Sequence, residues 1–218
     1  MPTKADLQTR VEDLEHDIRR LKRSLNQADL DIQKLEPKRL HWPTPHSDIK
    51  AVEAIKRALV EWESLVVDPC NRIDTYIRTS QGLGWAWEKP YKKNGQFAWC
   101  GAFASFAWNS VKLDIRKSTF SSCYRMNRDW GNTSRRIETD QMQTGDIVVV
   151  YSRARKSYGD HITLCVEPAD KDGNFKTVEG NAFGELGDGS RGEGVIQRSR
   201  SIDEVAHVYR LLSVDFNE

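Results

Sequence analysis

The apolar residues of this 218-residue chain change their spacing near the middle, and that change restricts the folds open to it. Through residue 111 they recur every three or four residues, which is the period of an amphipathic helix. Beyond residue 145 they fall in short runs of β-branched and apolar residues, which are typical of strands. Helices followed by strands favour an α+β domain. We therefore expect N-terminal helices packed on an antiparallel β-sheet.

Residues 1–36 carry a heptad repeat, in which the apolar residues from Leu7 to Leu35 follow one another in alternating steps of four and three. This spacing is the seam of a coiled coil. The a positions are mainly β-branched and the d positions mostly leucine, a combination that favours a parallel dimer. We expect a coiled-coil helix that self-associates, with the parallel dimer as the favoured state. The alternative is a helix that packs on its own globular domain.

Proline interrupts the helical pattern at Pro37, Pro43 and Pro45, so residues 37–47 are expected to form a linker. The remainder, residues 48–218, is expected to form one domain. Its expected helices cover residues 49–62, 71–79 and 100–111. The first of these helices carries an apolar face of Ile49, Val52, Ile55, Leu59 and Trp62. The expected strands cover residues 146–151, 161–166, 174–178, 195–200 and 207–212.

Charge and composition narrow the classes of partner. The formal net charge of +1 gives no reason to expect a nucleic-acid partner. Residues 112–156 are locally basic, which indicates a solvated face or, alternatively, a cradle for an anionic polymer. No apolar run approaches the length of about 20 residues that a membrane span needs, and the N-terminus lacks the apolar run of a secretory signal. The four cysteines include no C-x-x-C pair, so we expect no metal site, no cofactor and no disulfide framework.

Cys100 is the candidate nucleophile, because it stands where a loop enters the apolar segment 100–111. A thiol at the first turn of a helix is favoured as the thiolate by unpaired N–H groups and the helix dipole. The same N–H groups can stabilise an oxyanion. The other three cysteines lack this setting, since we expect Cys165 inside a strand, Cys70 in a turn and Cys123 in a polar loop.

His161 is the candidate base, because it begins an expected strand from which its ring can project towards the helix. A single histidine is more often structural than catalytic, but the other four lie in the heptad, beside the linker or in a late strand. An imidazole base needs a polar partner that fixes its tautomer. Glu179 and Asn181, at the end of the next strand, are both candidates, and Asn181 could instead help to bind an oxyanion.

Four blocks in this order resemble the CHAP family of cysteine, histidine-dependent amidohydrolases and peptidases, which are papain-like. The blocks are residues 97–106, 145–150, 160–164 and 178–181, and the resemblance covers roughly residues 50–214. It implies a papain-like CHAP fold, with Cys100 as nucleophile, His161 as base, Glu179 as its orienting partner and Asn181 as a polar helper. Some members carry an acidic calcium loop before the cysteine. The corresponding segment here is rich in lysine, so no calcium is expected.

The resemblance also implies a substrate, namely the amide or peptide bonds of peptidoglycan. We expect a peptidoglycan amidase or endopeptidase, of the phage-lysin or virion-associated type. It would be made in the cytoplasm without a signal peptide and would act on the bacterial cell wall. One alternative is a cysteine amidase or peptidase that cuts a non-wall amide, such as an exported toxin. The other is an inactive hydrolase domain that serves as a structural adaptor.

Overall fold

The computed structural model describes residues 47–80, 98–111, 113, 120, 122–151 and 159–216, all within the compact unit Thr44–Glu218. The α-helices are α2 (Ser47–Glu63), α3 (Asn71–Ser80), α4 (Cys100–Asn109) and α5 (Cys123–Trp130). The strands are β1 (Arg136–Ile137), β2 (Ile147–Val150), β3 (His161–Glu167), β4 (Asn174–Glu185), β5 (Arg191–Ser201) and β6 (Val205–Tyr209). The expected coiled coil lies outside the described residues, as does the expected linker except for Ser47, which begins α2.

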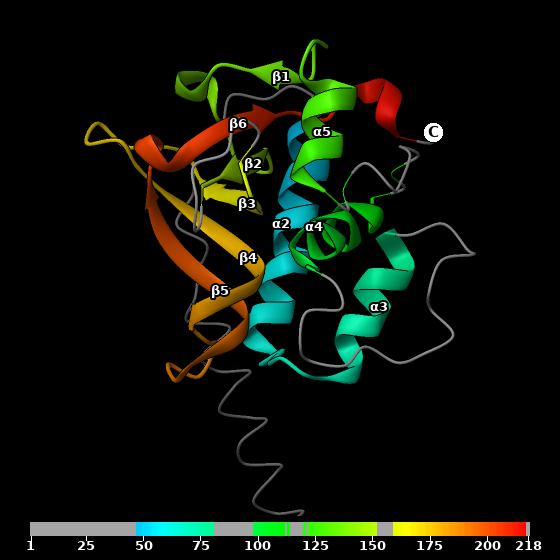
Figure 1. Cartoon of the computed structure of the whole chain (residues 1–218), viewed down its shortest axis with the longest axis vertical. Helices are drawn as coiled ribbons and strands as arrows, with labels where there is room; N and C mark the ends of the chain where they lie inside the picture. Colours follow the sequence, from blue (N-terminus) through cyan, green and yellow to red (C-terminus); the bar gives the residue numbers. More distant parts are fainter. Residues whose placement is uncertain are drawn as a thin grey trace, which may run out of the picture. The chain divides into compact units, whose positions relative to one another are not determined.

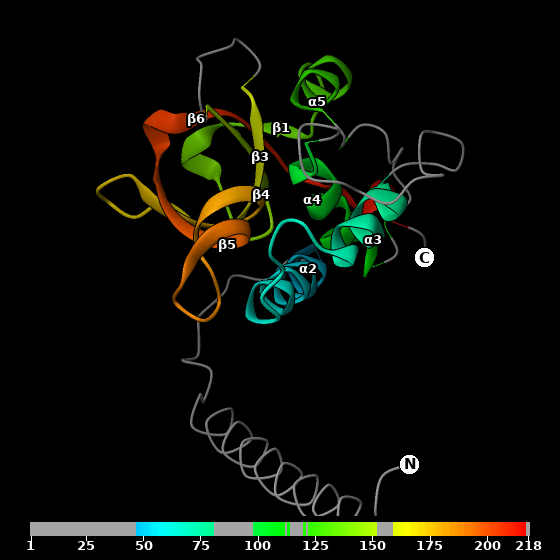
Figure 2. The same ribbon diagram turned by 60° about the horizontal axis from the view of Figure 1, so that its bottom comes forward.

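The strands form one six-stranded sheet in the order β1-β6-β2-β3-β4-β5, and every neighbouring pair is antiparallel. The prediction of an α+β fold with an antiparallel sheet is therefore confirmed. Figure 2 shows that the sheet is strongly curved, with α2, α3 and α4 on one side of it. None of the described helices is long and apolar enough to cross a membrane.

Helix α4 is the centre of the helical layer. It contacts α2 and α3 on one side and the strands β3 and β4 on the other (Figure 1). Its residues from Cys100 to Trp108 are all buried, as expected for a helix that is apolar on every face. The 100–111 prediction is confirmed to within two residues at its C-terminal end.

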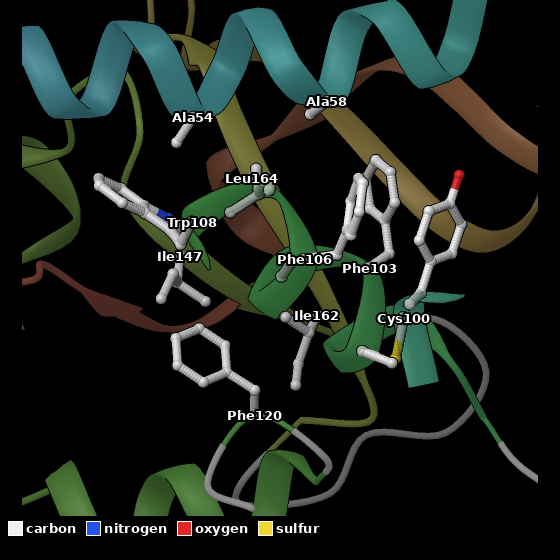
Figure 3. Packing of buried hydrophobic residues seen from close by; sticks show 14 of the residues in the cluster. Ala54, Ala58, Cys100, Phe103, Phe106, Trp108, Phe120, Ile147, Ile162 and Leu164 are labelled. Atoms are coloured by element: carbon white, nitrogen blue, oxygen red, sulfur yellow. The ribbon is translucent and has the colours of Figure 1, made fainter. Parts of the chain in front are cut away.

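The buried face of α2 agrees with the predicted one at Ile55, which is buried, and at Leu59 and Trp62, which pack against the core, but not at Ile49. Ile49, placed on that face by its spacing, is 60% exposed, whereas Ala54 and Ala58 are fully buried. Figure 3 shows these two alanines directed from α2 towards the core. Small side chains allow two helices to approach closely, so alanines can belong to an inward face although they add little to the apolar pattern. The prediction from apolar spacing counted only the large residues and therefore included Ile49 and left out the two alanines.

The expectation of a polar loop around Cys123 is wrong, because this residue begins α5. Ser122 caps the helix by accepting the main-chain N–H of Arg125 at 3.4 Å. Cys123, Met126 and Trp130 form its buried face. Their spacing of three and four residues is helical, and together with Ser122 it was the signal that could have predicted this short helix.

Strand β4 continues past its predicted end at residue 178. The Glu-Gly-Asn sequence at 179–181 interrupts the apolar alternation, which suggested a strand end. The pairing of β4 with β5 instead shifts register between Glu179 and Ala182 and then resumes. A β-bulge of this kind absorbs the irregular residues without ending the strand.

Gly180 of β4 lies against the beginning of α4. A Cβ atom on Gly180 would fall 2.6 Å from both Phe103 Cβ and Trp99 Cζ3. We expect Gly180→Ala to lower the free energy of unfolding by about 1–3 kcal/mol, because the extra methyl overpacks this contact. Urea denaturation measures the change. Gly189→Asn is the control, since Gly189 has a φ of +81°, which asparagine tolerates, and its Cβ would meet nothing within 4 Å. Equal stability of the two variants would contradict the prediction.

Candidate active site

Cys100 is the first residue of α4, and no side chain caps this end of the helix. Cys100 is 6% exposed and lies at the margin of the buried apolar cluster (Figure 3). It is hydrogen-bonded to the His161 side chain and to the main-chain N–H groups of Ile162 and Gly101. The first turn of α4 thus meets the main chain of β3 at the point where that strand begins. An N–H-rich, nearly dry setting of this kind stabilises a thiolate.

His161 is the first residue of β3 and is 6% exposed. Its Nε2 lies 3.0 Å from Oε2 of Glu179. Nδ1 is therefore the ring nitrogen that can take the proton of the Cys100 thiol. The three residues form one line of hydrogen bonds that runs from α4 through β3 to β4.

The register of the sheet explains why His161 and Glu179 meet. In the β3–β4 ladder Leu164 pairs with Val178, and Cys165 pairs with Thr177. Since side chains alternate along a strand, Thr177 and Glu179 share the face that carries Cys165 and His161. Glu179 is then a diagonal neighbour of His161, within reach of its ring.

Glu179 is completely buried, and every partner of its carboxylate is a hydrogen-bond donor. Oε1 accepts a hydrogen bond from Thr177 Oγ1 at 2.5 Å and another from Arg200 Nε at 2.6 Å. Oε2 accepts Arg200 Nη2 at 2.8 Å, besides its contact with His161. Sequence reasoning missed both Thr177 and Arg200. The sequence pattern marks neither residue, since Arg200 is one of two arginines in the expected strand 195–200.

Asn181 lies in the bulge of β4, half-buried, with a φ of +58°. Asparagine is one of the few residues that adopt this left-handed conformation readily. Among the described residues, the structure gives its side chain no hydrogen bond to Cys100, His161 or Glu179. Of the two residues considered as partners of the imidazole, the structure brings Glu179 into contact with it and does not bring Asn181.

The electrostatics of the pair favour charge separation. Burial alone would raise the pKa of the Cys100 thiol. The hydrogen bond and charge of His161, with the N–H groups of Ile162 and Gly101, instead hold that pKa below its ordinary value of 9.0. Burial would likewise lower the pKa of His161, but its contacts with Cys100 and Glu179 raise that pKa to about 9. Both shifts act in the same sense and favour a thiolate beside an imidazolium.

Glu179 and Cys165 show how far the local surroundings decide each pKa. Burial works to raise the pKa of the Glu179 carboxyl, yet the hydrogen bonds from Arg200 and His161 hold it far below its usual range. Burial raises the pKa of the Cys165 thiol, and the carboxylate of Asp146 raises it further. Cys165 is therefore a poor nucleophile despite its place in the same sheet.

The pH dependence of the site follows from these shifts. A lowered thiol pKa means that the Cys100 thiolate should form below pH 9, and a His161 pKa of about 9 means that the imidazolium is lost above it. We expect hydrolysis to rise with pH as the thiolate forms and to fall as pH passes about 9. Thiolate ultraviolet absorbance and initial rates across pH check both limbs, with Cys100→Ser as the baseline. A thiolate that first forms above pH 9 would contradict this prediction.

The four cysteines are all described, and all are free thiols. Among the residues that the structure describes, no group of three or more His, Cys, Asp or Glu side chains could hold a metal ion. The lysine-rich segment before Cys100, from which calcium binding was not expected, lies outside that part of the chain.

Comparison of the chain with protein-family models, with curated proteins and with solved structures gave no match.

Proposed function

We propose that this chain is a cysteine hydrolase of amide bonds, in which Cys100 is the nucleophile and His161 the base. The observation that carries the proposal is the line of hydrogen bonds from the Cys100 thiol at the start of α4, through His161, to the buried carboxylate of Glu179. A thiolate needs access to a base, an orienting partner for that base and a source of positive potential. These three requirements meet at one point of the domain.

The mechanism is acyl transfer in two stages. The Cys100 thiolate attacks the carbonyl carbon, and a thioester forms as the carbon–nitrogen bond breaks. The His161 imidazolium gives its proton to the leaving amine. The neutral imidazole then takes a proton from water, and the resulting hydroxide cleaves the thioester and releases the carboxylic acid. The oxyanion of each tetrahedral intermediate is assigned to the main-chain N–H groups at the start of α4, with Asn181 as a further donor.

The proposed substrate is the peptide moiety of peptidoglycan, cut by an amidase or endopeptidase activity on a papain-like CHAP fold. Its support is the resemblance of the blocks around Cys100, His161 and Glu179 to the CHAP family. Self-association through residues 1–36 would strengthen binding to this polymer. Two linked catalytic domains bind a repetitive polymer more tightly than one, even when each binds weakly. A phage lysin or virion-associated lysin is the corresponding biological setting.

Digestion of purified peptidoglycan from several wall types, followed by mass analysis of the fragments, tests the proposal. We expect soluble fragments with a new carboxyl and a new amine terminus, and none from the Cys100→Ala protein. Alkylation of Cys100 is measured in parallel. Fast alkylation without fragments would reject the wall substrate and favour another amide. Alkylation no faster than that of an ordinary thiol would reject the enzyme and favour a structural adaptor.

A further inference from the structure

Arg200 is an arginine buried next to the candidate site, 3% exposed and contributed by β5. Its Nε and Nη2 atoms bind both oxygens of Glu179, at 2.6 and 2.8 Å. Its Nη1 binds Oε2 of Glu204 at 2.5 Å, and Glu204 belongs to the short turn η3 (Ile202–Glu204). Two-pronged pairing of this kind fixes the plane of a carboxylate as well as its charge.

A carboxylate as deeply buried as Glu179 is unstable in its charged form unless cations or donors surround it. His161 cannot supply a constant positive charge, because it releases its proton during each catalytic cycle. Arg200 keeps its charge at every step, since a guanidinium does not lose its proton in proteins. Glu179 can therefore stay ionised while His161 changes protonation state.

The same pairing decides the tautomer of His161. Both oxygens of Glu179 receive hydrogen bonds from Arg200, and Oε1 receives a third from Thr177. The carboxylate carries no proton to donate, so Nε2 of His161 must be the donor in its contact with Oε2. Nδ1 of the neutral ring is then the acceptor, and it is the atom available to the Cys100 thiol.

We propose that Arg200 is a positioning residue, which holds Glu179 ionised and oriented so that His161 presents its Nδ1 to Cys100. This inference rests on the proposed function for its catalytic meaning, but its consequence is a property of the free protein. Arg200 touches neither Cys100 nor the site of the reacting carbonyl through any contact of the described residues. It acts through Glu179.

The test measures the pKa of the Cys100 thiol by thiolate absorbance and by alkylation rate, neither of which needs a substrate. We expect Arg200→Met to raise that pKa by at least about one unit, so that alkylation slows about tenfold at pH values below both thiol pKa values. Arg200→Lys should show a smaller loss, because lysine keeps the charge but cannot bind both oxygens. Arg198→Met is the matched control. This variant removes a guanidinium from the same strand, β5. The Arg198 guanidinium donates a hydrogen bond to the carbonyl oxygen of Phe183 and not to Glu179.

A second comparison covers the case in which Arg200→Met fails to fold around an unpaired Glu179. The double variant Glu179→Gln with Arg200→Met removes both charges and is compared with Glu179→Gln alone. If Arg200 acts through Glu179, the two proteins have the same thiol pKa. The proposal would be overturned if the double variant had a thiol pKa higher than that of Glu179→Gln by as much as Arg200→Met raises it in the wild-type protein. It would also be overturned if the Cys100 thiol of Arg200→Met kept its wild-type pKa. Failure of the proposed function is a separate result, namely that the wild-type protein releases no fragments from any wall.

Discussion

Replacing Cys100 with alanine is expected to abolish hydrolysis and to leave the domain folded. The Cys100 thiol lies at the start of α4 and is hydrogen-bonded to the side chain of His161. Alanine is smaller than cysteine and is the best helix former, so the first turn of α4 should persist. Release of peptidoglycan fragments measures the loss, and thermal unfolding followed by circular dichroism checks the fold.

Cys70 offers the best control for this experiment. It lies between α2 and α3, it is only partly buried, and its replacement by alanine should leave the rate unchanged. Cys165 is a poorer control, because it is completely buried in β3 and its truncation would open a cavity. Full turnover by Cys100→Ala would reject the proposed mechanism outright, whatever the behaviour of the other cysteine variants.

Replacing His161 with alanine is expected to have the second-largest effect, a loss of roughly 10²–10⁴-fold in rate. The imidazole has two tasks, since it draws the proton from Cys100 and returns it to the leaving amine. Its removal also ends the hydrogen bond and the charge that lower the pKa of the thiol. Initial rates of hydrolysis measure the loss. The thiolate absorbance of the same variant should appear only at higher pH than in the wild-type protein.

Two further variants should lose less activity than His161→Ala and serve for comparison with it. Glu179→Gln keeps the shape of the side chain but removes the charge that orients His161, so we expect a loss on the order of 10–10³-fold. We expect Asn181→Ala to cost a similar factor if Asn181 donates to the oxyanion. A rate in His161→Ala equal to that of the wild-type protein would show that the base lies elsewhere.

The strongest predictions from sequence were those that depended on local periodicity. Residues 71–79 and 100–111 have apolar spacing typical of helices, and α3 and α4 lie there. The runs at 146–151 and 161–166 correspond closely to β2 and β3. In these segments the apolar spacing favours the structure that the packing also favours, so short-range pattern and long-range packing agree. The α+β class followed from the order of such segments.

The errors occurred where short-range preference was weak. Helix α5 has a single narrow apolar face and β1 is two residues long, so neither produces a pattern that stands out. Ile49 fits the apolar spacing of α2 and is nevertheless exposed, whereas Ala54 and Ala58 are fully buried, and the spacing of α2 does not contain this difference. The continuation of β4 depended on pairing with β5 across a bulge.

The sequence by itself determined the α+β class, and it singled out Cys100, His161 and Glu179 as residues that could act together. It left open whether Glu179 or Asn181 would meet the imidazole, and it contained no visible sign that Arg200 would bind the carboxylate. Only the tertiary structure decided these two points. The reason is physical: periodicity reports the preferences of neighbours along the chain, whereas the β3–β4 and β4–β5 registers join residues about 20 positions apart. A shift of one residue would turn Glu179 to the other face of the sheet, away from His161.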